Sequence, residues 1–65
     1  MKVTITIQTD NAVFQDVGDP SIETARILKE LASKIDGHPH FSPGFDYALH
    51  DLYGNECGYL TIKKA

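Results

Sequence analysis

Two histidines flank a single proline in the run His38-Pro39-His40, which is the arrangement in this sequence that comes closest to a metal site. Imidazole nitrogens bind zinc and other transition metals. Further ligands could come from Asp36, Asp46, His50 or Cys57. However, the spacing fits no common zinc signature, and the proline restricts how far the two rings can converge. We therefore favour solvated loop histidines and expect no metal; a metal-binding or catalytic role for this loop is the weakest alternative.

Groups that could act as catalysts are scattered. Cys57 and His50 have the chemistry of a thiolate nucleophile and its base, but a sheet surface without a pocket or oxyanion donors does not support that role. The carboxylates Asp46, Asp51 and Glu56 lack a second group that converges on them for acid–base work. The sequence also contains no glycine-rich phosphate loop and no Gly-x-Ser-x-Gly motif. We expect a protein that is not an enzyme and uses no cofactor.

Length and composition bound the fold and the partners. With 65 residues the chain has room for one domain, spanning residues 1–65, and one small core. An apolar fraction of 42% and a charged fraction of 23% are typical of a folded protein. The formal charge of -3 argues against non-specific binding of nucleic acid. A single cysteine, with neither a signal-peptide pattern nor a long apolar run, predicts a cytoplasmic protein.

Hydrophobic periodicity predicts one strand followed by one helix. Alternation over 3–7 indicates a half-buried strand, and residues 12–19 should form a loop that Val13, Phe14 and Val17 fasten to the core. Asp19-Pro20 is a typical helix start, and Gly37 a typical end. The apolar stripe of the helix is predicted to contain Ile22, Ala25, Leu28, Leu31, Ala32 and Ile35, flanked by Ile27.

The second half of the chain predicts a loop and a hairpin. Prolines and glycines exclude a helix over 37–45, where Phe41 and Phe45 could anchor the loop. Segments 47–53 and 56–63 flank Gly54-Asn55, which suits a two-residue turn. The resulting register pairs Tyr53 with Glu56, Leu49 with Leu60 and Tyr47 with Ile62. Tyr47, Leu49, Leu60 and Ile62 then form one apolar face, which also includes Gly58.

These elements predict an α+β fold with the order β-α-β-β. A right-handed crossover makes the second strand parallel to the first, and inserting the third strand between them makes every neighbouring pair antiparallel. We therefore expect strand order 1-3-2, with the helix on one face. The other face is predicted to carry Thr4, Thr6, Gln8, Ala48, His50, Leu52, Cys57, Tyr59 and Thr61. It is an ordinary solvated face or, because of its apolar members, a surface for self-association or a partner.

This topology separates the charges into two ends. One end is predicted to hold the candidate partner-binding carboxylates without any lysine or arginine; they are Asp10, Asp16, Asp19, Glu23, Asp51 and Glu56. The opposite end gathers Lys2, Lys34, Lys63 and Lys64, with Asp36 and Asp46 among them. Acidic groups serve solubility in many proteins. The sharper hypothesis is that this end docks on a basic protein that normally holds nucleic acid.

Three segments give the chain a resemblance to a family. The opening Met1–Phe14, the run Ala25-Arg26-Ile27-Leu28 with Leu31-Ala32, and the hairpin Asp51-Leu52-Tyr53-Gly54-Asn55 resemble very small phage and prophage proteins. Some of these are similar to anti-CRISPR inhibitors of type I-C effector complexes. The resemblance implies a monomer or weak dimer that binds an effector subunit and blocks recognition of target DNA without catalysis. The alternative is a phage accessory protein that self-assembles or binds a host protein through its open sheet face.

Overall fold

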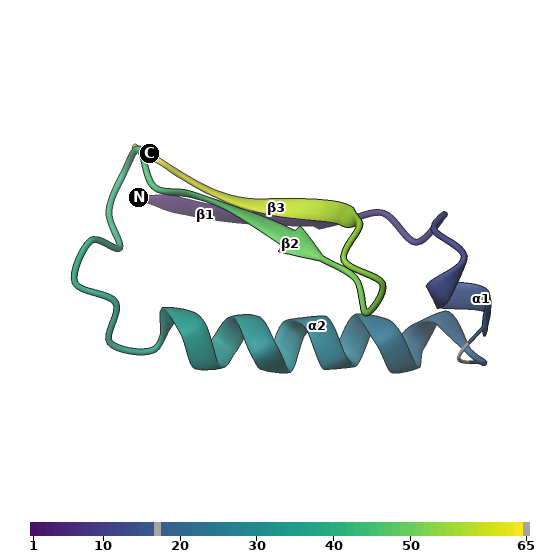
Figure 1. Ribbon diagram of the computed structural model, residues 1–65. Coiled ribbons are helices and arrows are strands. Elements are labelled where there is room, and N and C mark those ends of the chain that lie inside the picture. Colours follow the sequence, from purple (N-terminus) through teal and green to yellow (C-terminus); the bar gives the residue numbers. More distant parts are fainter. Residues whose placement is uncertain (17, 65) are drawn as a thin grey trace.

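A computed structural model describes residues 1–16 and 18–64 of the chain. The elements are β1 (Lys2–Ile7), α1 (Val13–Asp16), α2 (Pro20–Ile35), β2 (Asp46–His50) and β3 (Glu56–Lys63). The three strands form an antiparallel sheet in the order β1-β3-β2, and α2 lies along one face of it (Figure 1). The predicted α+β fold and its strand order are confirmed.

The long helix begins and ends where the sequence predicts. Asp19 caps it by accepting a hydrogen bond from the backbone N–H of Ser21 at 2.8 Å, and Pro20 follows as its first residue. After Asp36 the chain leaves the helix at Gly37, whose φ of 73° lies in the left-handed region that glycine adopts without strain.

The prediction of which face of α2 is buried is wrong: the helix is rotated about its axis relative to the predicted orientation. The buried residues are Glu23, Ile27 and Leu31, whereas Ile22 and Leu28 are 57% and 42% exposed. The three buried positions follow at intervals of four residues and therefore share one face. The helix adopts this rotation because Glu23 points inward, where it accepts hydrogen bonds from the Arg26 side chain and from the backbone N–H of Leu52.

The loop predicted at 12–19 contains the one-turn helix α1. Its turn is closed by hydrogen bonds from the N–H groups of Phe14, Gln15 and Asp16 to the carbonyl oxygens of Asn11 and Ala12. Val13 and Phe14 are completely buried, as expected, and Phe14 is the largest side chain at the centre of the core. The same expectation for Val17 lies outside the described residues.

The hairpin is formed, but its register differs from the predicted one by two residues. Tyr47 pairs with Leu60 and Leu49 with Gly58. A shift of two residues leaves the paired side chains beyond the bulge on their predicted face, because the side-chain period of a strand is two. Leu49, Leu60 and Ile62 are accordingly buried and Tyr47 packs against them.

The shift has two causes: the turn closes earlier, with His50 instead of Tyr53 opposite Glu56, and a one-residue β-bulge then moves the register back by one and relocates Cys57. Leu49 pairs with Gly58 but His50 pairs with Glu56, so that Cys57 is an extra residue on β3. The bulge turns Cys57 into the core, where it is 5% exposed, and its predicted place on the open sheet face is therefore wrong. Leu52 also leaves that face, because β2 ends at His50 and Leu52 lies in the connecting loop.

Beside the bulge, Gly58 allows two strands to approach closely. A Cβ at this position would overlap the backbone carbonyl oxygen of Thr6 on β1. Gly58→Ala should therefore lower the free energy of unfolding by about 3 kcal/mol, because the backbone of β1 must move away. Gly37→Ala is the control, since a Cβ there meets no atom within 4 Å and its φ of 73° lies in the left-handed region, which costs alanine about 1–2 kcal/mol. Urea unfolding measures both, and equal losses would contradict the close approach.

Candidate partner-binding surface

One end of the molecule assembles four segments of the chain. The residues after β1, the short helix α1, the start of α2 and the β2–β3 loop meet there, while both chain termini lie at the other end (Figure 1). This is the arrangement that the predicted charge separation requires. It brings the segments bearing the six candidate carboxylates to one end, but those carboxylates have different environments, and they divide into a buried pair and an exposed set.

Glu23 is the most deeply buried of the six. Its side chain is 2% exposed and accepts two hydrogen bonds of 2.7 Å from the guanidinium of Arg26, one turn further along α2. Its Oε2 also accepts the backbone N–H of Leu52 at 2.9 Å, which ties the β2–β3 loop to the helix. The hydrogen bonds from Arg26 hold the pKa of Glu23 below its usual range in spite of burial. Arg26 binds Glu30 as well, at 2.8 Å, so this end of the helix does carry a cation, contrary to the prediction.

Asp51 is the second buried carboxylate, with 5% of its surface exposed. Its Oδ1 accepts the backbone N–H groups of Tyr53 and Asn55 at 2.9 and 3.0 Å, and its Oδ2 accepts the side-chain amide of Asn11 at 2.8 Å. Burial by itself would raise the pKa of Asp51, but these donors, the N–H of Asn55 first, hold it below its usual range. Asp51 thus shapes the loop and binds it to the segment after β1.

Glu23 and Asp51 are therefore not available to a partner in the folded protein. The four exposed members of the predicted set, Asp10, Asp16, Asp19 and Glu56, remain, and we call them the acidic end. Asp16 accepts the phenol O–H of Tyr53 at 3.0 Å, a contact that raises the pKa of that phenol, and Asp19 caps α2. Within the described part of the chain, the side chains of Asp10 and Glu56 form no hydrogen bond or ion pair.

Three exposed apolar side chains at the same end were not predicted. Ile22, Leu52 and Tyr53 are 57%, 59% and 55% exposed. The sequence predicts Ile22 in the apolar stripe of the helix and Leu52 on the open sheet face. Sequence periodicity cannot reveal them, because the inward position that Ile22 would take is occupied by its neighbour Glu23. Since Leu52 and Tyr53 follow the buried Asp51 in a fixed loop, their exposure is imposed by the loop.

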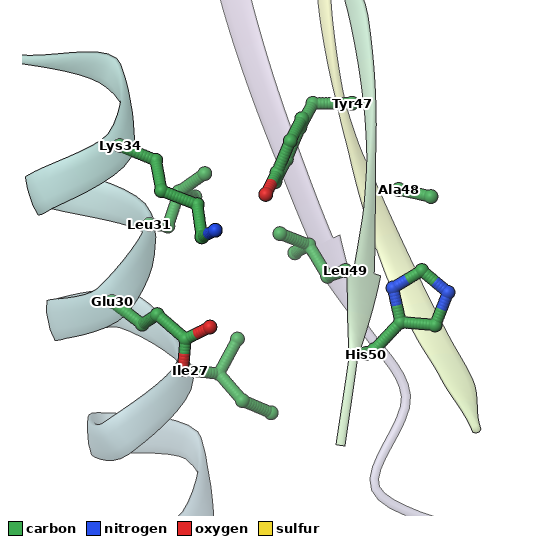
Figure 2. A pocket seen from close by; sticks show the side chains of 8 residues that line it. All are labelled: Ile27, Glu30, Leu31, Lys34, Tyr47, Ala48, Leu49 and His50. Carbon is green, nitrogen blue, oxygen red and sulfur yellow. The ribbon is translucent and has the colours of Figure 1, made fainter. Parts of the chain in front are cut away.

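One cavity among the described residues lies elsewhere, between α2 and β2. It has a volume of about 170 Å³ and a floor of Ile27, Leu31 and Leu49. In Figure 2 Tyr47 and Leu49 point toward the helix, whereas His50 points away from it. Pockets for small molecules are usually at least about 300 Å³. This opening is thus too small to enclose a substrate and has no convergent catalytic groups.

The candidate metal and nucleophile residues do not come together. The backbone N–H of His40 donates to Nδ1 of His38 at 3.1 Å, and the His38 ring stands edge-on to Phe45 at 4.9 Å. These contacts give both histidines a role in ordering the loop. Burial raises the pKa of Cys57, which keeps its thiol protonated. In the described part of the chain no three His, Cys, Asp or Glu residues are placed to hold one metal ion.

Removing the buried carboxylate should loosen the whole end. Glu23→Ala leaves Arg26 and the N–H of Leu52 without their acceptor, so we expect a loss of about 2 kcal/mol in the free energy of unfolding. The loss stays this small because Arg26 is one-third exposed and water screens its charge. Glu30→Ala is the matched control: Glu30 is 56% exposed and binds the same arginine, so its loss should cost less than about 0.5 kcal/mol. Chemical denaturation gives both values, and equal losses would argue against Glu23 as an anchor.

The buried carboxylates should also make stability depend on acid. Glu23 and Asp51 have folded-state pKa values below the ordinary 4.5 and 3.8, so the unfolded chain takes up protons first as the pH falls. Their contribution to stability is complete above pH 4.5 and is lost as the pH drops below 3.8 through the folded values. Urea unfolding across this range should show the decline, and it should be shallower in Glu23→Gln. The same slope in both proteins would exclude Glu23 from the transition.

No helix within the described residues is long and apolar enough to cross a membrane. No family model matches the chain, and comparison with curated proteins and with solved structures gives no significant match.

Proposed function

We propose that this protein is a non-enzymatic inhibitor that docks its acidic end on a basic, nucleic-acid-binding protein and keeps that protein from its nucleic acid. The observation that carries the proposal is the combination of charge and apolar exposure at one end of the fold. Asp10, Asp16, Asp19 and Glu56 are exposed there together with Ile22, Leu52 and Tyr53. Charged groups alone would serve solubility equally well, but large exposed apolar side chains would not.

The composition of this end fits what is known of protein interfaces. Such interfaces have a core in which aromatic and large aliphatic residues dominate, and a polar rim that remains accessible to water. Tyr53 and Leu52 are suited to the core, and the surrounding carboxylates to a rim that faces lysine and arginine. Complementary charge of this kind speeds association and selects the partner more than it adds affinity.

The base beneath this surface is pre-organised. Glu23 holds the N–H of Leu52, and Asp51 holds that of Tyr53, so the backbone that presents both apolar residues is fixed before a partner arrives. Asp16 in turn holds the phenol of Tyr53. A surface that is ordered beforehand loses less entropy on binding, which leaves more of the contact energy for affinity.

The sequence resemblance narrows the class of partner. Similarity to type I-C anti-CRISPR proteins makes a subunit of a type I CRISPR effector complex our first candidate. Such complexes hold target DNA in cationic grooves, where carboxylates could take the place of phosphates as a mimic of DNA. Binding of this kind falls steeply with salt, since the charges are screened. A bacterial cytoplasmic location follows from this proposal.

The alternative surface, the open sheet face, is more polar in the structure than the sequence predicts. With Cys57 in the core and Leu52 in the loop, Tyr59 is its large apolar residue, 49% exposed, among threonines, Gln8, Ala48 and His50. Such a face resembles the solvated side of an ordinary antiparallel sheet. It offers a partner less apolar surface than the acidic end does.

A charge-reversal pair tests the proposal at residues with no internal role. Asp10→Lys with Glu56→Lys should weaken binding to purified type I effector subunits at least about tenfold and flatten its salt dependence. The control, Asp36→Lys with Asp46→Lys, makes the same change in net charge at the other end of the molecule. Calorimetry at low and moderate salt measures the affinities, and thermal melts establish that both variants fold.

Each result has a definite meaning. Equal weakening by the two double variants would show that net charge alone matters, and would remove the acidic end from the mechanism. A third variant, Leu52→Ser, changes no charge and should also weaken binding, because it removes an apolar group from the proposed contact. If the wild-type chain binds no effector subunit even at low salt, the assignment of this partner is wrong.

A further inference from the structure

The strand β1 is an edge of the sheet, and its outward backbone groups can be identified. Ile62 of β3 exchanges hydrogen bonds with Gly44 and Phe45 on the β2 side, while the carbonyl of Cys57 accepts the N–H of Gln8 on the β1 side. Backbone direction alternates along an antiparallel strand. From the register it follows that Thr4 and Thr6 bond to β3, whereas the N–H and C=O groups of Val3, Ile5 and Ile7 point outward.

The side chains of the same strand are only partly covered. Val3 and Ile5 pair with Ile62 and Leu60 and so lie on the helix-side face, yet they are 41% and 42% exposed. The flank of α2 turned toward β2 carries Glu30 and Lys34, which line the cavity there. Leu28, also 42% exposed, lies on the opposite flank, so apolar surface continues from the helix toward the β1 edge.

The two edges of the sheet are protected to very different degrees. Proteins guard edge strands with charges, short length and bulges. The β2 edge is five residues long and has Asp46 and His50 at its ends, and the bulge on β3 interrupts its pairing next to His50. The β1 edge is six residues long and has Lys2 at its start, but the stretch Val3-Thr4-Ile5-Thr6-Ile7 that follows has no charge, proline or bulge. An unguarded strand of β-branched residues is suited to pairing with another strand.

We infer that β1 is the contact through which two copies of this chain associate, pairing antiparallel about Ile5 into one six-stranded sheet. This register is self-complementary. Ile5 faces its own copy and Val3 faces Ile7, which places apolar side chains together on the helix side, while Thr4 faces Thr6 on the other side. Both α2 helices then lie on the same face, and the half-exposed apolar residues of each copy are buried against the other.

Charge supports the antiparallel direction and a second copy as the occupant. Within one protomer Lys2 lies directly opposite Lys63, and in the described residues neither lysine has an acidic partner in an ion pair. Like charges in directly opposed positions destabilise a sheet. In the antiparallel pair, Lys2 of one copy faces Gln8 of the other, two residues before Asp10. The cationic end of each β1 therefore meets the acidic end of its neighbour.

Sedimentation equilibrium of the full chain tests the inference without any partner protein, so it can fail independently of the proposed function. The wild-type chain should show a concentration-dependent monomer–dimer equilibrium. Ile5→Lys places two ammonium groups against each other and should raise the dimer dissociation constant at least about tenfold. Tyr59→Lys is the control, because Tyr59 is similarly exposed on the other face of the sheet. Its dissociation constant should remain within about twofold of the wild type.

A covalent test remains usable if Ile5→Lys fails to fold. In the proposed register the two Ile5 Cα atoms are about 5.5 Å apart, a distance that a disulfide spans. Ile5→Cys should thus form a disulfide-linked dimer on mild oxidation, whereas Ala48→Cys on the exposed β2 edge should not. A wild-type chain that stays monomeric at millimolar concentration would overturn the inference. The inference would also be overturned if Tyr59→Lys dissociated the dimer and Ile5→Lys did not. A chain that stays monomeric and pairs β1 only with strands of other proteins would overturn it as well.

Discussion

The fold depends on burying two carboxylates next to each other in a very small core. Burial raises the cost of ionising both carboxylates, and the charge of Asp51 adds to that cost for Glu23. Both remain charged because Arg26 and four N–H donors surround them. These donors come from three parts of the chain: Asn11 follows β1, Arg26 lies in α2, and Leu52, Tyr53 and Asn55 lie in the β2–β3 loop. The same bonds that satisfy the charges therefore hold the segment after β1, the helix and the β2–β3 loop together.

This constraint explains why apolar residues appear on the outside. A helix with Glu23 turned inward must turn Ile22 outward, since adjacent residues lie about 100° apart around the axis. In the same way, a loop that wraps around Asp51 presents Leu52 and Tyr53 to solvent. Exposure of these side chains is thus coupled to the interactions that stabilise the fold, and it cannot be removed by a small local adjustment.

The fold class, strand order and helix boundaries follow from the sequence because each has a local cause. The alternation of β1, the Asp19-Pro20 start and Gly37 act over a few residues. The helix rotation and the bulge at Cys57 do not, because they depend on which donors surround Glu23 and on how close Thr6 comes to Gly58. The carboxylates of the acidic end were likewise found from their order along the chain, but only the tertiary contacts separate the buried pair from the exposed four. Even the two-residue error in the hairpin register is informative: face alternation constrains register only to within an even shift.

The two proposed contacts share one residue, and this has a consequence for how they would work together. Antiparallel pairing of β1 places the acidic ends at opposite ends of a dimer, so one groove on a partner could receive only one of them. It also brings Lys2 of each copy toward Asp10 of the other, and that carboxylate would then be partly neutralised before it met a basic partner. Self-association and partner binding are for that reason expected to oppose each other, by an amount set by the interactions of Asp10 in the two states. Asp16, Asp19 and Glu56 are not adjacent to the paired strand in sequence, and they would keep the remaining charge of the acidic end directed outward in either state.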